Sequence, residues 1–241
     1  MCHGRSVAAE VNGVMNLDPK KLYSATVTCP VCNRPFPVTK VRVGSYRIAD
    51  RDSDFAINFE GVNPIFYEVF VCENCGYAAL QDCFANIGPA GQKIIAATVT
   101  PYWRPKSYGG ERTLDGALDT YKLALYCLQL LKAKASAIAQ ICMRIAWLYR
   151  WKGDPREMEF LRFALDYYSD AYQFENFPIK NLDEPHCLYL IAELHRRVGN
   201  LVEAARWFNK LFSSPAARQD RLLWNLAYDQ YQLIKDLRRG S

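Results

Sequence analysis

Long hydrophobic runs are missing from this sequence of 241 residues. The longest candidate, residues 123–131, ends before Lys132 and Lys134, whereas a membrane-spanning helix needs about 20 mostly apolar residues. The first fifteen residues carry Arg5 and Glu10 and have no unbroken apolar stretch of the kind found in secretory signals. We therefore expect a protein that neither spans a membrane nor is exported.

Clusters of like charge are also missing. Thirty Lys and Arg stand against 25 Asp and Glu, which gives a net charge of +5, and the excess is spread over both halves of the chain. Nucleic acids and anionic membranes are bound by clustered Lys and Arg, so a mainly electrostatic role on either is not favoured. The composition, 50% hydrophobic and 23% charged, is typical of a folded globular protein.

Catalytic signatures are equally scarce. The sequence has three histidines, His3, His186 and His195, and none stands beside a Ser, Cys or acid in a recognisable nucleophilic motif. The glycine-containing segment 88–93 is too short for a phosphate-binding loop and lacks its Ser or Thr. These absences favour a protein that is not an enzyme.

The two halves of the chain differ in the period of their apolar residues. Up to about Tyr108, stretches rich in Val, Thr, Phe and Tyr alternate as strands do. The Pro- and Gly-rich segment 88–110 suits a connector and resists regular structure. From Leu114 onward, apolar residues recur every three or four positions, as on a helix. We predict an α+β protein with a mobile N-terminus over 1–16, a β-rich domain with its connector over 17–108, and a helical domain over 109–241.

Six helices are predicted in the second half. Joints rich in Gly, Asn and Pro separate them, and such short joints make neighbouring helices antiparallel. Two hairpins share a pattern, because the spacing between Ala146 and Gly153 recurs between Ala192 and Gly199. This pattern resembles the tetratricopeptide repeat, and a plain helix bundle is the alternative. The predicted ranges are 114–131, 135–151, 156–174, 184–198, 201–212 and 219–237.

Cysteine is abundant, with nine residues. An odd number in a long chain without an export signal indicates reduced thiols and a cytoplasmic protein. Four of them form two pairs, Cys29 with Cys32 and Cys72 with Cys75, with two residues inside each pair and 39 residues between the pairs. One tight turn can present both sulfurs of such a pair to a single ion, and two turns complete a tetrahedral zinc site.

The residue after each pair supports a zinc-ribbon-like site. Asn33 and Gly76 are types that tolerate the left-handed backbone such turns require. Four thiolates leave zinc no open position for water, which argues against a hydrolytic centre. We therefore predict structural zinc, with iron as one alternative and redox-active dithiols as another. Cys127 and Cys142 are expected to be inert core residues.

Alternating acids stand out at Asp50, Asp52 and Asp54. They do not open a calcium loop, because Phe55 and Gly61 occupy the positions that would need Gly and Glu. The simplest interpretation is the solvated face of a strand with arginines as neighbours. The alternative is a patch that recognises a partner, made of Arg47, Asp50, Asp52 and Asp54.

The order of these motifs resembles the bacterial family called domain of unknown function 2225. The resemblance covers nearly the whole chain from about Leu17 and rests on 23–32, 52–55, Asn63-Pro64 with Tyr67, 71–78, Arg112-Thr113, 121–125 and 146–150. It implies a cytosolic bacterial protein with a zinc-ribbon-like head and a helical-repeat tail. It also implies that the metal ligands are Cys29, Cys32, Cys72 and Cys75, and it implies no activity.

The resulting hypothesis is a cytoplasmic, non-enzymatic zinc protein that acts as an adaptor or scaffold. A stacked helical array commonly offers a concave surface to other proteins, so a protein partner is expected, whereas a membrane or a nucleic acid is not. The alternative hypothesis is a thiol-based redox or metal-responsive protein that uses the two cysteine pairs.

Overall fold

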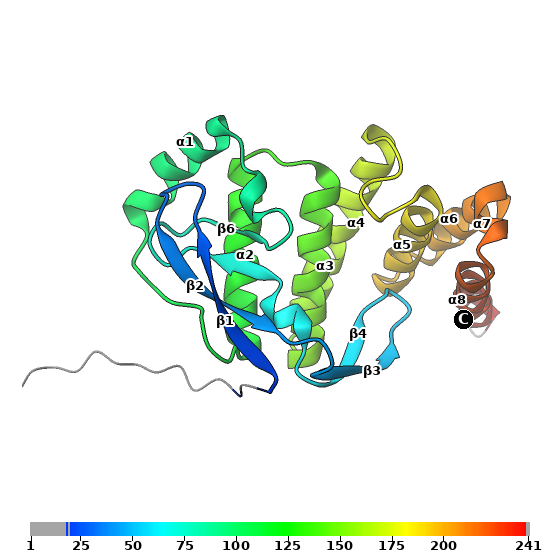
Figure 1. The fold of residues 1–241 in the computed structure, drawn as a ribbon. Coiled ribbons are helices and arrows are strands. Elements are labelled where there is room, and N and C mark those ends of the chain that lie inside the picture. Colours follow the sequence, from blue (N-terminus) through cyan, green and yellow to red (C-terminus); the bar gives the residue numbers. More distant parts are fainter. Residues whose placement is uncertain (1–17, 19, 240–241) are drawn as a thin grey trace, which may run out of the picture.

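The computed structural model describes residue 18 and residues 20–239 and is shown in Figure 1. Within these residues, small antiparallel strand pairs come first and eight helices follow, which confirms the predicted α+β fold class. The predicted mobile segment 1–16 lies outside the described residues. None of the helices in the described ranges is long and apolar enough to cross a membrane.

The strands form three separate two-stranded antiparallel sheets rather than one larger sheet. β1 (Leu22–Thr28) pairs with β2 (Pro35–Val41), β3 (Tyr46–Arg51) with β4 (Ile57–Gly61), and β5 (Val69–Val71) with β6 (Ala78–Leu80). In β1 the predicted alternation is visible, since Ser24 and Thr26 are exposed while Ala25 and Val27 pack against the core. An isolated two-stranded sheet is marginally stable in water, so each sheet depends on what it packs against.

The helices in the described ranges are α1 (Pro89–Thr98), α2 (Leu114–Leu130), α3 (Ala135–Lys152), α4 (Glu157–Phe174), α5 (Glu184–Arg197), α6 (Leu201–Ser213), α7 (Pro215–Gln219) and α8 (Arg221–Arg239). The six predicted helices correspond to α2 to α6 and α8 within two residues at each end, whereas α1 and α7 were not predicted. Thr113 and Asp183 cap α2 and α5, because their side-chain oxygens accept hydrogen bonds from first-turn amides. Gly153 ends α3 with a φ of 68°, a left-handed conformation that glycine adopts without steric cost.

The segment 88–110 is more ordered than its composition indicates. The expectation of irregular structure was wrong for residues 89–98, which form α1. Pro89 occupies the first turn, where its missing N–H breaks no helical hydrogen bond. Ile95 is buried, and the adjoining Gly91 lies against side chains of Ile87 and Leu131. Tertiary packing thus stabilises a helix that the local sequence disfavours.

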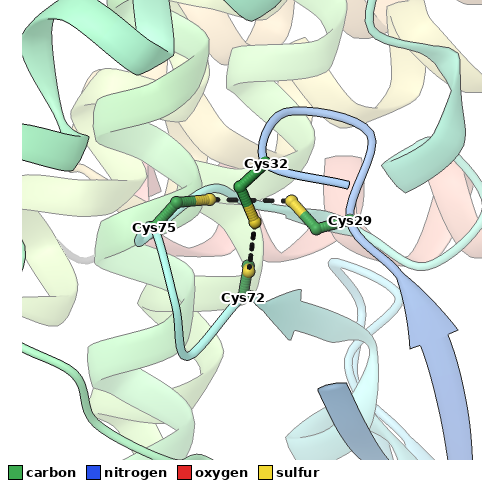
Figure 2. A group of neighbouring side chains, drawn as sticks. All are labelled: Cys29, Cys32, Cys72 and Cys75. Atoms are coloured by element: carbon green, nitrogen blue, oxygen red, sulfur yellow. Dashed lines mark hydrogen bonds between the residues drawn. The ribbon is translucent and has the colours of Figure 1, made fainter. Parts of the chain in front are cut away.

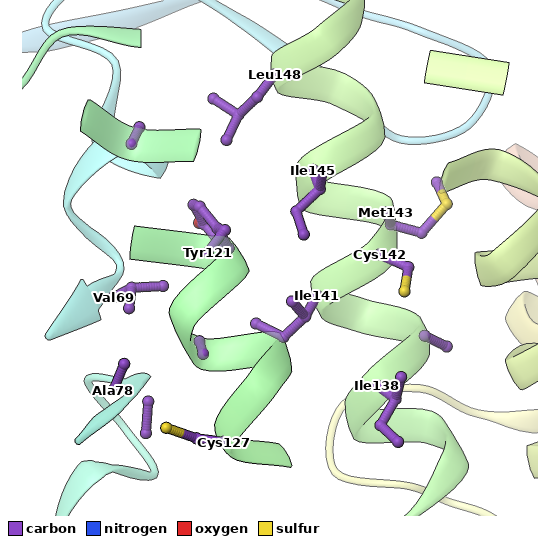
Figure 3. Packing of buried hydrophobic residues seen from close by; sticks show 14 of the residues in the cluster. Val69, Ala78, Tyr121, Cys127, Ile138, Ile141, Cys142, Met143, Ile145 and Leu148 are labelled. Atoms are coloured by element: carbon purple, nitrogen blue, oxygen red, sulfur yellow. The ribbon is translucent and has the colours of Figure 1, made fainter. Parts of the chain in front are cut away.

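One hydrophobic core runs through the strand pairs and the first helices. α2 packs against β5 and β6 on one side and against α3 on the other. Figure 3 shows Ile141, Ile145 and Leu148 on the side of α3 that faces α2, whereas Met143 points away from it. A second cluster joins α5, α6, α7 and α8. The helix α2 therefore contacts both the strands of the first half and the helices of the second. That the two halves of the chain fold separately stays a prediction.

Candidate metal centre

The first pair of cysteines lies in the turn that follows β1. The amide of Asn33 donates to the carbonyl of Cys29 over 2.9 Å, and the amide of Cys29 donates to the carbonyl of Arg34 over 3.0 Å. Asn33 has a φ of 56°, the left-handed conformation expected at this position. The turn brings the side chain of Cys32 back toward that of Cys29 (Figure 2).

The second pair lies in a matching turn after β5. Gly76 donates to the carbonyl of Cys72 over 2.9 Å, and Cys72 donates to that of Tyr77 over 2.8 Å. Gly76 has a φ of 77°, again as expected. A Cβ at this position would come within 2.6 Å of the Trp103 indole, so glycine is required for space as well as for conformation. The indole N–H donates to the carbonyl of Glu73 over 2.8 Å.

The two turns bring all four sulfur atoms together, as Figure 2 shows. The four Sγ atoms lie within 4.8 Å of one another. Sγ of Cys29 is 3.6 Å from that of Cys75, and Sγ of Cys32 is 3.6 Å from that of Cys72. A tetrahedron of sulfurs about 2.3 Å from a central zinc ion has edges of about 3.8 Å, so the group has the size of a metal site. Disulfide sulfurs would be about 2.05 Å apart, and these thiols are free.

The thiols of Cys29, Cys72 and Cys75 lie close enough to shift one another's pKa. The hydrogen bond with Cys72 raises the pKa of Cys29 to about 12, and contact with Cys29 and Cys72 raises the pKa of Cys75 well above its usual range. The pKa of Cys72 is lowered, because Cys29 and Cys75 stabilise its thiolate. A divalent cation favours thiolates over thiols at every ligand, which fits this donor set.

The surroundings close the site. Cys29, Cys72 and Cys75 are buried and Cys32 is partly buried. The hydroxyl of Thr100 donates to the carbonyl of Cys75 over 3.4 Å, so the segment after α1 covers the second turn together with the indole described above. Thr100 and Trp103 were not predicted from the sequence, because no motif links the segment after α1 to the cysteines. Four sulfur ligands in such a setting leave no position for a substrate, so the group suits a structural ion.

The other described cysteines lie apart from this group. Burial raises the pKa of Cys127 to about 11 and those of Cys142 and Cys187 to about 12, as expected for inert core thiols. Cys83 differs, because the ammonium group of Lys180 lies 2.8 Å from its sulfur. Within the described residues, the four-cysteine group is the one cluster of His, Cys, Asp or Glu with the geometry to hold a metal ion.

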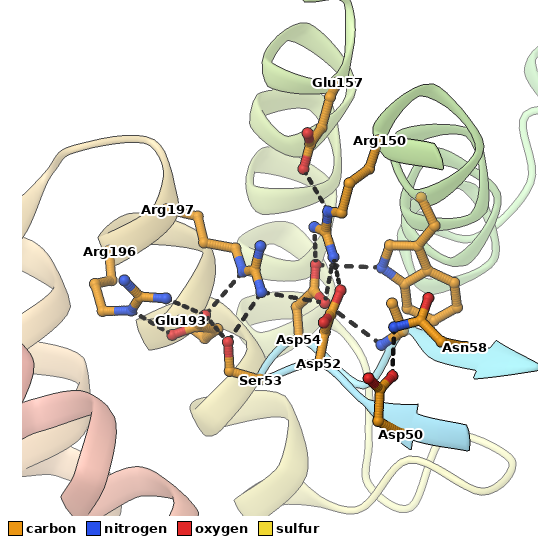
Figure 4. A network of polar contacts seen from close by, with 12 residues as sticks. Asp50, Asp52, Ser53, Asp54, Asn58, Arg150, Glu157, Glu193, Arg196 and Arg197 are labelled. Atoms are coloured by element: carbon orange, nitrogen blue, oxygen red, sulfur yellow. Dashed lines mark hydrogen bonds and ion pairs between the residues drawn. The ribbon is translucent and has the colours of Figure 1, made fainter. Parts of the chain in front are cut away.

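The structure divides the predicted recognition patch in two (Figure 4). Arg47 and Asp50 are exposed on β3, where the interpretation as a solvated strand face is correct. Asp54 is 0% exposed, so the expectation that it contacts a partner or faces solvent was wrong. Asp52 is partly buried, and its carboxylate accepts a hydrogen bond of 2.6 Å from Arg150. Recognition by Arg47 and Asp50 stays a prediction.

Asp54 and Arg150 belong to an ionic network that joins three parts of the chain (Figure 4). The Arg150 guanidinium contacts both Asp54 oxygens, at 2.5 and 3.1 Å, while its Nε donates to Glu157 over 2.7 Å. Arg197 on α5 donates to Ser53 over 2.9 Å and to Glu193 over 2.8 Å. Burial opposes ionisation of Asp54, but the nearby arginines outweigh it and hold the pKa of Asp54 below its usual range.

Fold and site together define an α+β protein in which two cysteine turns form a closed group with the geometry to hold one metal ion. The chain belongs to the family described as an uncharacterized protein conserved in bacteria, DUF2225, whose model matches residues 22–234. This match confirms the resemblance noted from the sequence motifs. No curated protein and no solved structure matches the chain.

Proposed function

We propose that the four cysteines bind one structural zinc ion and that the protein is a non-enzymatic, cytoplasmic adaptor whose helices bind another protein. The observation that carries the zinc assignment is the arrangement of four Sγ atoms within 4.8 Å of one another on two matching turns. Zinc is the usual ion of closed four-cysteine sites, and iron is the alternative that elemental analysis distinguishes.

The ion would cross-link two sheets that share a hydrophobic core but no strand hydrogen bonds. Cys29 and Cys32 belong to the β1–β2 sheet, while Cys72 and Cys75 belong to the β5–β6 sheet, and these sheets share no strand hydrogen bonds. Binding of a structural zinc ion contributes on the order of 10–16 kcal/mol in peptide systems. A contribution of that size is comparable to the net stability of a domain, so the ion would hold the strand pairs in place.

The helical half supports the adaptor role. Ala146 and Ala192 are completely buried, as small residues are where two helices of a repeat approach closely. Gly153 and Gly199 follow α3 and α5 with positive φ, in the same place relative to those alanines. Successive helices pack in order, with extensive contact between α3 and α4 and between α5 and α6. These features support a tetratricopeptide-like arrangement.

Apolar side chains are exposed at the end of the array. Leu222 on α8 is 83% exposed, and Leu233 and Leu237 on the same helix are exposed as well. Leu222, Leu233 and Leu237 fall on one face of a helix, because their spacings of 11 and 4 residues are close to whole numbers of turns. These leucines are candidate contacts for a partner, although the exposed Asp229 lies between Leu222 and Leu233 on the same face.

Affinity capture from a native lysate tests the adaptor proposal. The wild-type chain is expected to retain a protein partner, and the double variant Leu222→Asp/Leu233→Asp is expected to lose it while keeping its metal. Lys20→Asp, an exposed change far from α8 in the sequence, serves as the matched control. If neither the wild type nor Lys20→Asp retained a protein partner, the result would count against the adaptor role.

Thiol titration separates this proposal from the redox or metal-responsive alternative. A structural ion protects all four cysteines from a thiol reagent until a chelator removes it. Redox-active pairs would instead form disulfides within Cys29–Cys32 and Cys72–Cys75 at a cytosolic potential.

A further inference from the structure

A cavity of about 590 Å³ adjoins the ionic network, since Asp54 is one of its lining residues. Its walls come from α3, α4 and the segment 176–182, together with the turn at Cys83. The floor is formed by buried side chains, among them Met143, Trp147 and Leu190. Cavities of this size with mostly apolar walls and a few polar groups are typical of small-molecule sites.

Two polar groups that line the cavity have no hydrogen-bond partner among the described residues. Tyr168 is 7% exposed, and its hydroxyl makes no hydrogen bond to any described residue. Burial raises the pKa of this tyrosine, so the hydroxyl keeps its proton and can donate it to a ligand. The side-chain amide of Gln140 lines the same cavity and is likewise unbonded within the described part of the chain. Of the two, Tyr168 is buried whereas Gln140 is partly exposed, and buried polar side chains normally have partners, so the unpartnered Tyr168 hydroxyl in this cavity points to a ligand.

Arg144 supplies a positive charge next to these groups. Its Nε donates to Glu68 over 2.9 Å, and its guanidinium lies 4.4 Å from the centre of the Trp147 ring. Its two terminal nitrogens contact no acceptor among the residues that the structure describes, and the side chain lines the cavity. A guanidinium that is fixed at one nitrogen and open at the other two is suited to a carboxylate, sulfonate or phosphate group.

The rim adds more donors than acceptors. Lys134 and Lys180 line the opening and are exposed. Of the two acids that line the cavity, Asp54 already accepts hydrogen bonds from Arg150 and Trp147, and Asp82 lies 3.4 Å from Lys180. The cavity therefore offers cationic and neutral donors but little free negative charge.

We infer that this cavity binds a small organic anion with an apolar body. Arg144 and Tyr168 hold its anionic group, and the body lies against the apolar floor. The site is separate from the four-cysteine centre and from the exposed face of α8. The thiol of Cys83, 2.8 Å from the ammonium of Lys180, stands at the opening, where a bound molecule would shield it.

Anilinonaphthalene sulfonate is a suitable probe, because it combines an aromatic body with one negative charge and fluoresces when bound. N-phenylnaphthylamine, the same body without the sulfonate, is the matched neutral compound. We expect one saturable site on the full-length metal-bound protein, with at least about tenfold weaker binding of the neutral compound, as the loss of a hydrogen-bonded charge implies. Tyr168→Phe, which removes only the hydroxyl, should weaken the sulfonate about tenfold.

A blocking variant locates the probe. Ala137 lines the cavity from the first turn of α3 and is only partly buried, so Ala137→Trp should fill the space and weaken the sulfonate at least about tenfold. Ala97→Trp, on the exposed side of α1, adds the same ring elsewhere and should change nothing.

Alkylation of Cys83, followed by peptide mass spectrometry, gives a second readout that needs no variant. Saturating sulfonate should slow the modification of Cys83 severalfold. Equal binding of the two probes, tight binding to Ala137→Trp, absence of binding, or an unchanged rate of Cys83 alkylation would each overturn the assignment.

Discussion

Arg150 and Asp54 form an ion pair, with Nη2 of the arginine 2.5 Å from Oδ2 of a carboxylate that has no exposed surface. The pair joins α3 to the turn between β3 and β4, which lies 96 residues earlier in the chain. Trp147 donates to the same carboxylate over 3.2 Å. The acids of this turn thus anchor the β3–β4 sheet to the helices.

Removal of Arg150 is expected to cost much of the protein's stability. Arg150→Met leaves Asp54 buried with only the more distant Arg197, 3.6 Å away, as a cationic partner. An uncompensated buried charge of this kind costs about 3–5 kcal/mol of unfolding free energy, which urea titration would measure. Arg156→Met breaks an exposed pair with Asp154 and should have far less effect. Equal losses in the two variants would show that the network does not stabilise the fold.

Stability should fall at acidic pH through Asp54. Its folded pKa lies below the unfolded value of about 3.9, so the carboxylate contributes stability above that pH and loses it as the pH falls through the folded pKa. Urea midpoints measured for the wild type and Asp54→Asn should differ most near neutral pH, and the difference should begin to shrink only as the pH falls below about 4. Subtracting the midpoint of the variant from that of the wild type at each pH cancels the effect of metal loss in acid, which acts on both proteins. A constant difference would contradict the assigned pKa shift.

Gly76→Ala should damage the second cysteine turn more than an ordinary glycine replacement would. The alanine Cβ must fit beside the Trp103 indole at 2.6 Å and must also adopt a left-handed φ of 77°. Gly153→Ala is the matched control, since it has a φ of 68° but open space around it. The control should lose about 1–2 kcal/mol from conformation alone. Gly76→Ala should lose more and should release metal to a chelator faster, whereas equal stability and release rates would contradict the steric account.

Loss of one ligand should leave most of the helices intact. Cys29→Ser is expected to lose its metal and the order of the β1–β2 and β5–β6 sheets. Helices α3 to α8 pack mainly on one another, so most of the far-ultraviolet circular dichroism of helices should remain. Cys127→Ser changes a buried thiol outside the metal group and controls for the substitution itself. Collapse of the helical signal in Cys29→Ser alone would mean that the two halves fold as one unit.

Local patterns were sufficient for much of the fold. The period of apolar residues from Leu114 onward located α2 to α6 and α8 within two residues, because amphipathic helices carry their own signal. The spacing of the cysteines, with Asn33 and Gly76 after each pair, indicated both turns, since the left-handed residue is a local requirement. Features set by a few neighbouring residues were therefore predictable.

Features that depend on residues far apart in the sequence could not be predicted. Asp54 alternates with other acids as a solvated strand would, and nothing near it in the sequence announces Arg150. The helix α1 contains Pro89 and Gly91 and is stabilised by contacts with side chains outside it, among them Ile87 and Leu131. The packing of Trp103 on Gly76 and the cavity beside α3 likewise arise only when separate segments meet. Tertiary contacts of this kind override local preference.

X-ray absorption at the zinc edge of the purified protein tests the central claim most directly. The account predicts one zinc ion per chain with a single shell of four sulfur atoms at about 2.3 Å, unchanged in Cys127→Ser and lost in Cys72→Ser. A folded protein that carries no metal, or a shell containing oxygen or nitrogen in place of these sulfurs, would contradict it.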